Sequence, residues 1–259
     1  MQILYDGLSV EDDKVVYTSE LDSETDIMNT VEPDIYQSEF EGNIYYFGYT
    51  FKPNASRKHR STVIKWIKNL DGSGVDESTL RKFIDKPLKK FDSQINFSDI
   101  SCIVYPRSNR SNLTNIIIQE IGNFSQRDTV KTSAEFVKAL PKEVSFDWEM
   151  FDYEYDGEIG DNQYTQIRNY INNVLLSKIH DLDYFSIADS VKPRYRRYIQ
   201  NYLICDKRSE QVIKSMQSGK ILIVDDINTS GATLTEILRI VRKLNNTCDI
   251  YIFTLIGRG

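Results

Sequence analysis

The sequence predicts an α/β fold in which a parallel sheet is flanked by helices, preceded by an N-terminal α+β extension. Residues 101–105 and 221–224 are short apolar runs, and each is followed by a polar loop and an amphipathic segment. This is the order in which a βαβ unit begins, and uninterrupted apolar runs are typical of strands covered on both faces. We therefore divide the chain into an extension of unknown role, residues 1–98, and an α/β domain, residues 99–259.

The composition is that of a folded protein. The chain has 259 residues, of which 40% are hydrophobic and 12% aromatic, and this excludes a disordered or collagen-like chain. No apolar run approaches the roughly 20 residues that span a bilayer. The first residues also lack the basic and apolar regions of a signal peptide. We therefore expect a cytoplasmic protein without a membrane segment.

The charge of the chain bears on its partners. Lys and Arg number 32 and Asp and Glu 38, so the net charge is −6, which disfavours binding to nucleic acid. A local basic patch can still bind a small phosphorylated ligand. Because the three cysteines are far apart and only two histidines are present, we expect any metal ion to be held by oxygen.

Alternating apolar residues in the N-terminal part predict short strands, and apolar residues three or four apart predict two amphipathic helices. The expected strands span residues 2–5, 14–18 and 43–51, an acidic surface loop spans 20–41, and the helices span 61–70 and 77–91 with a DGSG turn at 71–74 between them.

The second part alternates predicted strands with predicted helices. In order, we expect a strand at 101–105, a polar loop at 107–112, helices at 113–121, 163–180 and 196–216, a strand at 221–224, a helix at 235–244 and a strand at 248–256. Residues 143–162 interleave acidic and aromatic side chains at a spacing that does not fit a calcium-binding loop. We interpret this segment as a solvated strand edge and connector.

The segment most informative about chemistry is ILIVDDINTSGATL, residues 221–234. A strand ends in two carboxylates, and a turn of small residues then opens a helix, so that backbone N–H groups and the positive end of the helix dipole converge on one anion. Gly231 lets the backbone approach closely. Hydroxyl donors are supplied by Thr229, Ser230 and Thr233.

Two adjacent acids beside an anion site have no use in binding phosphate alone, because their charges oppose it. Asp225 and Asp226 are useful if they accept hydrogen bonds from sugar hydroxyls or face a hydrated Mg²⁺ shared with a polyphosphate. The pattern therefore indicates a phosphorylated sugar or a polyphosphate bound with Mg²⁺. A site for another phosphorylated metabolite is the weaker alternative.

VDDINTSGAT resembles the phosphoribosyl-pyrophosphate motif of type I phosphoribosyltransferases. That motif has four apolar residues, two acids, two variable residues, Thr, Thr or Ser, Gly, any residue and Thr, and every defining position is filled from Ile221 to Thr233. The resemblance implies the type I parallel sheet flanked by helices from about Asp99 onward.

Within this family the chain looks most like the competence-associated ComF-type members. The Val104-Tyr105-Pro106 segment and the spacing of Gln200, Leu203 and Arg208 agree with them. Their cysteine-rich zinc knuckle is absent, so the resemblance does not extend to the N-terminal part.

The resemblance implies a role for each candidate residue. Asp225 and Asp226 would hold the ribose 2′ and 3′ hydroxyls and assist the placement of Mg²⁺ without binding it directly. The 5-phosphate would lie in a cradle formed by Thr229, Ser230, Gly231, Ala232 and Thr233. The pyrophosphate would contact backbone N–H groups and the guanidinium of a loop that comprises Arg107, Ser108 and Asn109. Arg194 and Arg197, in the basic stretch 192–197, would belong to a mobile lid.

The implied activity is transfer of phosphoribose from 5-phosphoribosyl 1-pyrophosphate to a nitrogenous acceptor, with release of pyrophosphate. Members that use 6-oxopurines have an Asp where this chain has Thr229, so a hypoxanthine or guanine acceptor is disfavoured. Because few residues follow the last predicted strand, we expect a hood over the acceptor to come from residues 1–98 or 143–195.

The alternative is a catalytically silent protein of the same fold that senses 5-phosphoribosyl 1-pyrophosphate or a nucleotide, in regulation or as part of a defence-associated assembly. In either case the expected partner is a small molecule, with a homo-oligomer or larger assembly as a further possibility.

Overall fold

The structure is a computed structural model that describes residues 2–4, 8–11, 14–17, 28–30, 38–51, 56–70, 75–108, 111–125, 133–155, 158–216 and 218–257. Its centre is an eight-stranded sheet with the order β11-β8-β7-β12-β13-β6-β4, in which β5 also pairs with β6. The parallel strands are β8 (Ser133–Lys138), β7 (Ile100–Pro106), β12 (Lys220–Ile227), β13 (Asp249–Gly257) and β6 (Asn43–Phe51). The antiparallel strands are β11 (Leu203–Cys205), β4 (Met28–Thr30) and β5 (Ser38–Phe40). The predicted α/β fold with a mostly parallel sheet is confirmed.

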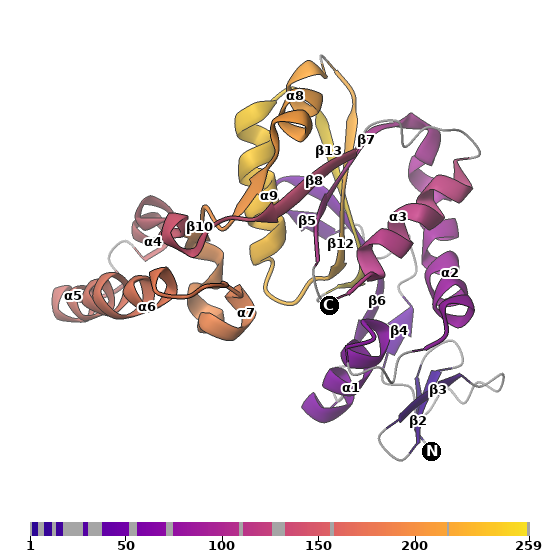
Figure 1. The fold of residues 1–259 in the computed structure, drawn as a ribbon, viewed down its shortest axis with the longest axis horizontal. Coiled ribbons are helices and arrows are strands. Elements are labelled where there is room, and N and C mark those ends of the chain that lie inside the picture. The colour runs from indigo at the N-terminus through magenta and orange to yellow at the C-terminus, as the bar shows by residue number, and fades with distance from the viewer. Residues whose placement is uncertain are drawn as a thin grey trace.

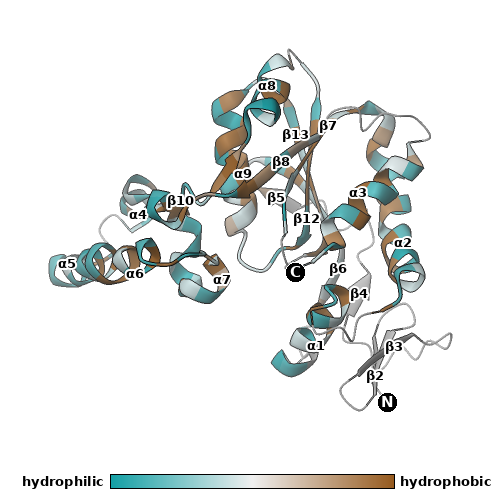
Figure 2. Cartoon of the chain, in the orientation of Figure 1, coloured by the Kyte–Doolittle hydropathy of each residue, from teal (hydrophilic) through white to brown (hydrophobic). Residues whose placement is uncertain are grey.

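Helices cover both faces of this sheet (Figure 1). One face carries α1 (Arg57–Ile67), α2 (Glu77–Ile95) and α3 (Leu113–Phe124), and the other carries α8 (Lys207–Ser215) and α9 (Ala232–Leu244). Figure 2 shows apolar central strands between helices whose outer faces are polar. Side chains of β12 alternate between the two layers, so that Leu222 and Val224 pack with α1–α3 while Ile221 and Ile223 pack with α9.

The chain between β8 and β11 forms a helical arm, residues 141–198, which extends away from the sheet beside α9 (Figure 1). The arm and the short strand after it contain η3 (Pro141–Glu143), β9 (Ser145–Phe146), α4 (Trp148–Tyr155), α5 (Asp161–Tyr170), the π-helical η4 (Ile171–Leu176), α6 (Ser177–His180), α7 (Ile187–Ser190), η5 (Pro193–Tyr198) and β10 (Ile199–Gln200), which pairs with β9. Buried Phe151, Ile171 and Tyr198 join its interior to the apolar layer beneath α9.

Most of the predicted elements are present, with shifted ends. Strands at residues 2–5, 14–18, 43–51, 101–105, 221–224 and 248–256 correspond to β1 (Gln2–Leu4), β3 (Lys14–Tyr17), β6, β7, β12 and β13, and the helices at 61–70, 77–91, 113–121, 163–180 and 235–244 correspond to α1, α2, α3, the α5–α6 segment and α9. The sequence did not predict β2 (Leu8–Glu11), which lies between β1 and β3, the 3-10 turn η2 (Phe97–Asp99), or β8.

The connector predicted at 143–162 is wrong, because this segment contributes to the core. Its aromatic residues Trp148, Phe151 and Tyr155 lie three and four positions apart on α4, and Phe146 and Phe151 are buried. The acids, which suggested a solvated strand edge, lie among these aromatic residues. A helical stripe of aromatic side chains was therefore mistaken for strand alternation.

The single helix predicted at 196–216 is also wrong. The segment contains the end of η5, then β10 and β11, and α8 begins only after Asp206, whose carboxylate accepts a hydrogen bond from the Ser209 N–H at 2.7 Å. Pairing of β11 with β8 at the sheet edge overrides the helical pattern of the first half.

The surface loop predicted at 20–41 is interrupted by β4 and β5, both of which pair with β6. Residues 20–27 and 31–37 of this loop, and the predicted turn at 71–74, lie outside the described residues.

The predicted domain boundary between residues 98 and 99 stays a prediction. β6, which precedes this boundary in the chain, belongs to the main sheet and pairs with β13. Among the helices of the described ranges, none has the length and apolarity needed to cross a membrane.

The close approach of α2 to β6 gives a stability prediction. A Cβ atom on Gly48 would lie 2.7 Å from the Cβ of Pro87 and 3.0 Å from the Leu255 carbonyl oxygen. We expect Gly48→Ala to lower the free energy of unfolding by about 1–3 kcal/mol through overpacking, measured by urea denaturation. Gly160→Ala is the control, because no atom lies within 4 Å of its added methyl group. Equal effects of the two substitutions would contradict the packing of α2 on β6.

Candidate functional site

The candidate site lies where the chain reverses its direction across the sheet. From β7 the chain passes through α3 to β8 on one side, whereas from β12 it passes through α9 to β13 on the other. Because α3 and α9 cover opposite faces, the loops after the neighbouring strands β7 and β12 separate at the carboxyl edge. Such a switch point is the usual ligand site of an open parallel sheet.

Asp225 and Asp226 lie near the carboxyl end of β12, just before this edge. Both residues are buried, with 7% and 5% of their surface exposed. The Asp226 N–H donates a hydrogen bond to Asp225 Oδ1 at 2.9 Å. Burial, with a further contribution from the charge of Asp226, raises the pKa of Asp225 to about 7. Strand alternation directs the two carboxylates to opposite faces, Asp225 with Ile223 and Asp226 with Val224. The buried carboxyl group of Asp225 thus loses its proton close to neutral pH.

Asp226 has a partner that the sequence analysis did not identify. Lys68, directly after α1, places its Nζ 2.9 Å from Oδ1 and 2.8 Å from Oδ2 of Asp226. Lys68 also opposes the rise in the pKa of Asp225. The two residues are 158 positions apart in the chain, so no local pattern could have paired them.

The turn after the acids is held by hydrogen bonds at the edge of the sheet. The Asn228 N–H donates to the Ile256 carbonyl at 2.8 Å, and the Asn228 side chain accepts from the Gly231 N–H at 2.8 Å. Its amide donates to the Tyr45 hydroxyl, which lies 2.8 Å from Thr254 Oγ1. Gly231 has a φ of 76°, a left-handed conformation that glycine adopts without strain. Asn228 therefore fixes the turn, a role that the sequence analysis did not assign.

The start of α9 provides donors for an anion. Gly231 is its N-cap and supplies no side-chain cap, so the first N–H groups of the helix, beginning with Ala232, have no acceptor within the helix. Thr229 is exposed and Ser230 and Thr233 are half-buried, while the side chain of Ala232 is buried. The structure thus brings Thr229, Ser230, Gly231, Ala232 and Thr233 together in one turn beside Asp225 and Asp226.

The β5–β6 hairpin borders this turn. A Cβ atom on Gly231 would lie 2.9 Å from the ring of Phe40, and Thr235 Oγ1 donates to Glu41 Oε1 at 2.6 Å. The hairpin therefore supplies one wall of the cradle, although the sequence analysis placed both residues at the end of a loop.

A second unpredicted neighbour is Tyr202, in the turn before β11. Its side chain is 4% exposed, and its hydroxyl makes no hydrogen bond of good geometry with any residue in the described ranges. Burial raises the pKa of Tyr202 well above its usual value, and the nearby carboxylates of Glu236 and Asp225 raise it further, while the Thr233 side chain beside the hydroxyl opposes the rise. Tyr202 therefore lies behind the cradle, in the layer to which Asp225 is directed.

In the loop after β7, one backbone N–H group that was predicted to bind pyrophosphate is already used within the sheet. The Arg107 N–H donates to the Phe136 carbonyl at 2.7 Å, so this donor serves the sheet. The Arg107 guanidinium is exposed, 3.6 Å from Glu135 Oε2. Ser108 Oγ accepts from the Ser111 N–H at 3.2 Å, and Asn109 lies outside the described residues. The predicted contact with pyrophosphate is therefore open to the Arg107 side chain rather than to its backbone N–H group.

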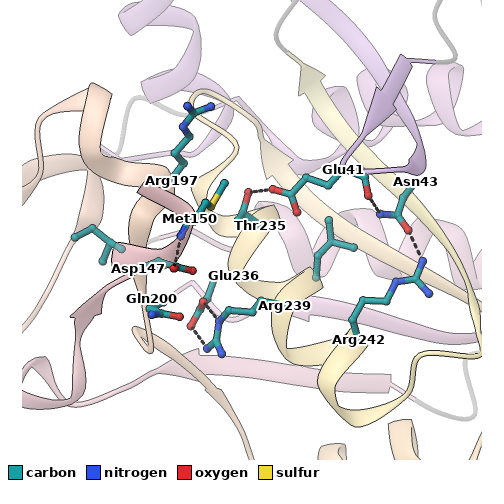
Figure 3. Close-up of a pocket in the computed structure, with 12 residues that line it drawn as sticks. Glu41, Asn43, Asp147, Met150, Arg197, Gln200, Thr235, Glu236, Arg239 and Arg242 are labelled. Carbon is teal, nitrogen blue, oxygen red and sulfur yellow. Dashed lines mark hydrogen bonds and ion pairs between the residues drawn. The ribbon is translucent and has the colours of Figure 1, made fainter. Parts of the chain in front are cut away.

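Three cavities are lined by residues of neighbouring elements, and none of the three has Asp225, Asp226 or a residue of the turn 229–233 among its described lining residues. Ser108 and Lys68 line one of about 520 Å³, between the end of α1, the start of α2 and the start of α3. Arg107 lines one of about 330 Å³ that also contacts Lys138 and Tyr184. The third, of about 280 Å³, lies between α9 and the helical arm (Figure 3).

The basic stretch 192–197 belongs to the arm. Arg197 forms an ion pair with Glu154, donates to the Tyr198 hydroxyl at 2.8 Å, and lines the third cavity opposite Thr235. The Arg194 guanidinium lies 4.6 Å from the centre of the Tyr195 ring. Arg107, Ser108 and Arg197 thus border three different cavities, and the lid role of Arg194 and Arg197 stays a prediction.

A scan against protein-family models finds no match to this chain, and a search of curated proteins finds none either.

The donor set fits Mg²⁺ in kind, because Asp225 and Asp226 offer carboxylate oxygens. Two carboxylates are too few for a protein-only site, and within the described ranges no group of three His, Cys, Asp or Glu side chains could hold a metal ion. Lys68 also occupies Asp226. Mg²⁺ at this site would therefore depend on oxygens from a ligand and from water.

The raised pKa of Asp225 predicts how stability depends on pH. Above pH 4 an unfolded aspartate is ionised, whereas folded Asp225 retains its proton up to about pH 7. The folded state therefore binds more protons in this range, and Asp225 makes stability fall as the pH rises from 4 to 7. Asp225→Asn keeps an acceptor for the Asp226 N–H and removes the charge. We expect its free energy of unfolding, relative to wild type, to increase between pH 5 and pH 8.

Urea denaturation at both pH values measures this difference. Asp249→Asn, at the exposed amino end of β13, is the control and should show a smaller change with pH. A difference for Asp225→Asn that stays constant between the two pH values would contradict the buried, partly protonated carboxyl.

Proposed function

We propose that this protein binds 5-phosphoribosyl 1-pyrophosphate with Mg²⁺ and transfers its phosphoribosyl group to a nitrogenous acceptor, on a sheet of the type I phosphoribosyltransferase kind. The observation that carries the proposal is the adjacency of two buried aspartates and an uncapped helix N-terminus at the switch point of a parallel sheet. A phosphate and a diol on one ligand suit this combination.

The turn supports binding of the 5-phosphate. The N–H groups at the start of α9 and the hydroxyls of Thr229, Ser230 and Thr233 can donate hydrogen bonds to phosphate oxygens. Asn228 fixes the turn beforehand, which reduces the entropy lost on binding. Asp225 and Asp226 can accept hydrogen bonds from the ribose hydroxyls, and such bonds to charged groups are the stronger kind.

Arg107 supports binding of the diphosphate, because its exposed guanidinium is a bidentate donor at the end of the neighbouring strand. In the reaction, the bond between C1 of the ribose and the pyrophosphate oxygen breaks, and a bond from C1 to the acceptor nitrogen forms. The acceptor loses a proton to solvent or to a basic group. Mg²⁺, when bound, would offset the negative charge that develops on the leaving diphosphate. No protein nucleophile is needed.

Calorimetry with 5-phosphoribosyl 1-pyrophosphate and Mg²⁺ tests the proposal. Wild-type protein should bind one equivalent, and Asp225→Asn with Asp226→Asn should weaken binding by about a hundredfold or more, since hydrogen bonds to two carboxylates are lost. Asp249→Asn changes a residue at the amino end of β13, at the opposite end of the parallel strands from the candidate site, and this variant should bind as wild type does. Circular dichroism would check that the double variant is folded.

Pyrophosphate release over a panel of nitrogenous bases then separates the two functions. Release with one of the bases supports the transferase. Binding without release would support the sensing protein of the same fold, and no binding by folded wild-type protein would overturn both.

A further inference from the structure

Lys68 holds its position at the paired aspartates through the fold of α1. The Lys68 N–H donates to the Ile64 carbonyl at 3.0 Å, and the buried side chains of Val63, Trp66 and Ile67 anchor the helix against the sheet. Asn69, two residues after the end of α1, has a φ of 51° and turns the chain away from the helix axis. The lysine stem therefore leaves a rigid element at a fixed distance from β12.

The ammonium group of Lys68 contacts both oxygens of Asp226, whose side chain is buried. A carboxylate in such surroundings needs a positive partner, because water cannot stabilise its charge there. In many sites of this kind the partner is a divalent cation held by oxygen. Here the chain supplies the cation itself, from a segment for which the sequence predicted no role.

Lys68 also borders the cavity of about 520 Å³. Polar groups from the loop after β7 line this cavity, including Ser108, Ser111 and Asn112. Lys68 is the one basic residue among its described lining residues, and the charge of Glu77 is offset by Arg81. An anion in this cavity would therefore have Lys68 as its cationic partner among the lining residues. Arg107 borders a different cavity, so its exposed side chain would have to turn to reach the same anion.

We infer that Lys68 is a built-in cation of the paired-aspartate site. It takes the place of a divalent ion at Asp226 when the protein is empty, and it passes to a diphosphate group in the adjacent cavity when a phosphorylated ligand binds. The flexible four-carbon stem of lysine permits this exchange while α1 stays in place. Asp226 is then released to accept ribose hydroxyls or a hydrated metal ion. The ligand class rests on the proposed function, whereas the contact with Asp226 does not.

A titration with Mn²⁺, followed by electron paramagnetic resonance, tests the first half without any substrate. Lys68→Met should bind Mn²⁺ about tenfold more tightly than wild type or more, and Mn²⁺ should raise the melting temperature of this variant alone. Lys68→Arg keeps the charge and should resemble wild type, as should Lys65→Met, which removes an exposed lysine of the same helix. Adding Asp226→Asn to Lys68→Met should abolish the gained Mn²⁺ binding.

Equal Mn²⁺ affinity of wild type and Lys68→Met would overturn this half. If Lys68→Met does not fold, Lys68→Gln with the same control decides the question, because glutamine keeps the polarity of the position and removes only the charge.

Calorimetry in the absence of metal tests the second half with two probes, inorganic diphosphate and 5-phosphoribosyl 1-pyrophosphate. Wild type and Lys68→Arg should bind diphosphate, and Lys68→Met should bind it about tenfold more weakly or worse. If diphosphate binds in this manner but 5-phosphoribosyl 1-pyrophosphate does not, the proposed function fails and the inference stands. If Lys68→Met binds diphosphate as wild type does, or wild type binds none, the exchange of Lys68 onto a ligand is wrong.

Discussion

The constraint on which the rest of the site depends is that the chain leaves two neighbouring parallel strands toward opposite faces of the sheet. β7 and β12 are paired in parallel, and the helices that follow them cover opposite faces of the sheet. The chain therefore leaves the two strands toward opposite faces, and the carboxyl edge between such strands is the usual place for a ligand. This arrangement places the candidate site residues at the ends of the two strands: Asp225, Asp226 and the turn to Gly231 at the end of β12, and Arg107 after β7.

Two adjacent carboxylates are buried at this edge, and their surroundings differ. Asp226 is compensated by Lys68, whereas Asp225 lies deeper, near Tyr202, and its pKa rises towards neutrality. Together these effects reduce the negative charge beside the anion cradle in the empty protein, which lowers the repulsion that a phosphorylated ligand would otherwise meet. The buried carboxyl group of Asp225 lowers the stability of the fold near neutral pH, and such a loss is common where a ligand binds.

The sequence predicted those parts of the site that lie close together in the chain. Residues 221–234 contain strand, acids, turn and helix within one segment, so hydrophobic pattern and turn chemistry sufficed. Lys68 and Asn228 were missed for different reasons. Lys68 meets Asp226 only through the packing of α1 on the sheet, 158 positions away in the chain. Asn228 occupies a variable position of the motif and acts through its turn. Tyr202 fell inside a helix predicted over β10 and β11, where strand pairing at the sheet edge prevailed over local pattern. β6 likewise joins β13 across some two hundred residues of chain, a pairing that no local periodicity can reveal.

Hydrogen–deuterium exchange with and without 5-phosphoribosyl 1-pyrophosphate and Mg²⁺ tests the central claim most directly, because it reports which amides the ligand protects. The account predicts slower exchange in residues 228–235, where the first N–H groups of α9 would donate to the 5-phosphate, with unchanged exchange in α8 at the other end of the sheet. Protection confined to the helical arm or to α8, with residues 228–235 exchanging as in the empty protein, would contradict it.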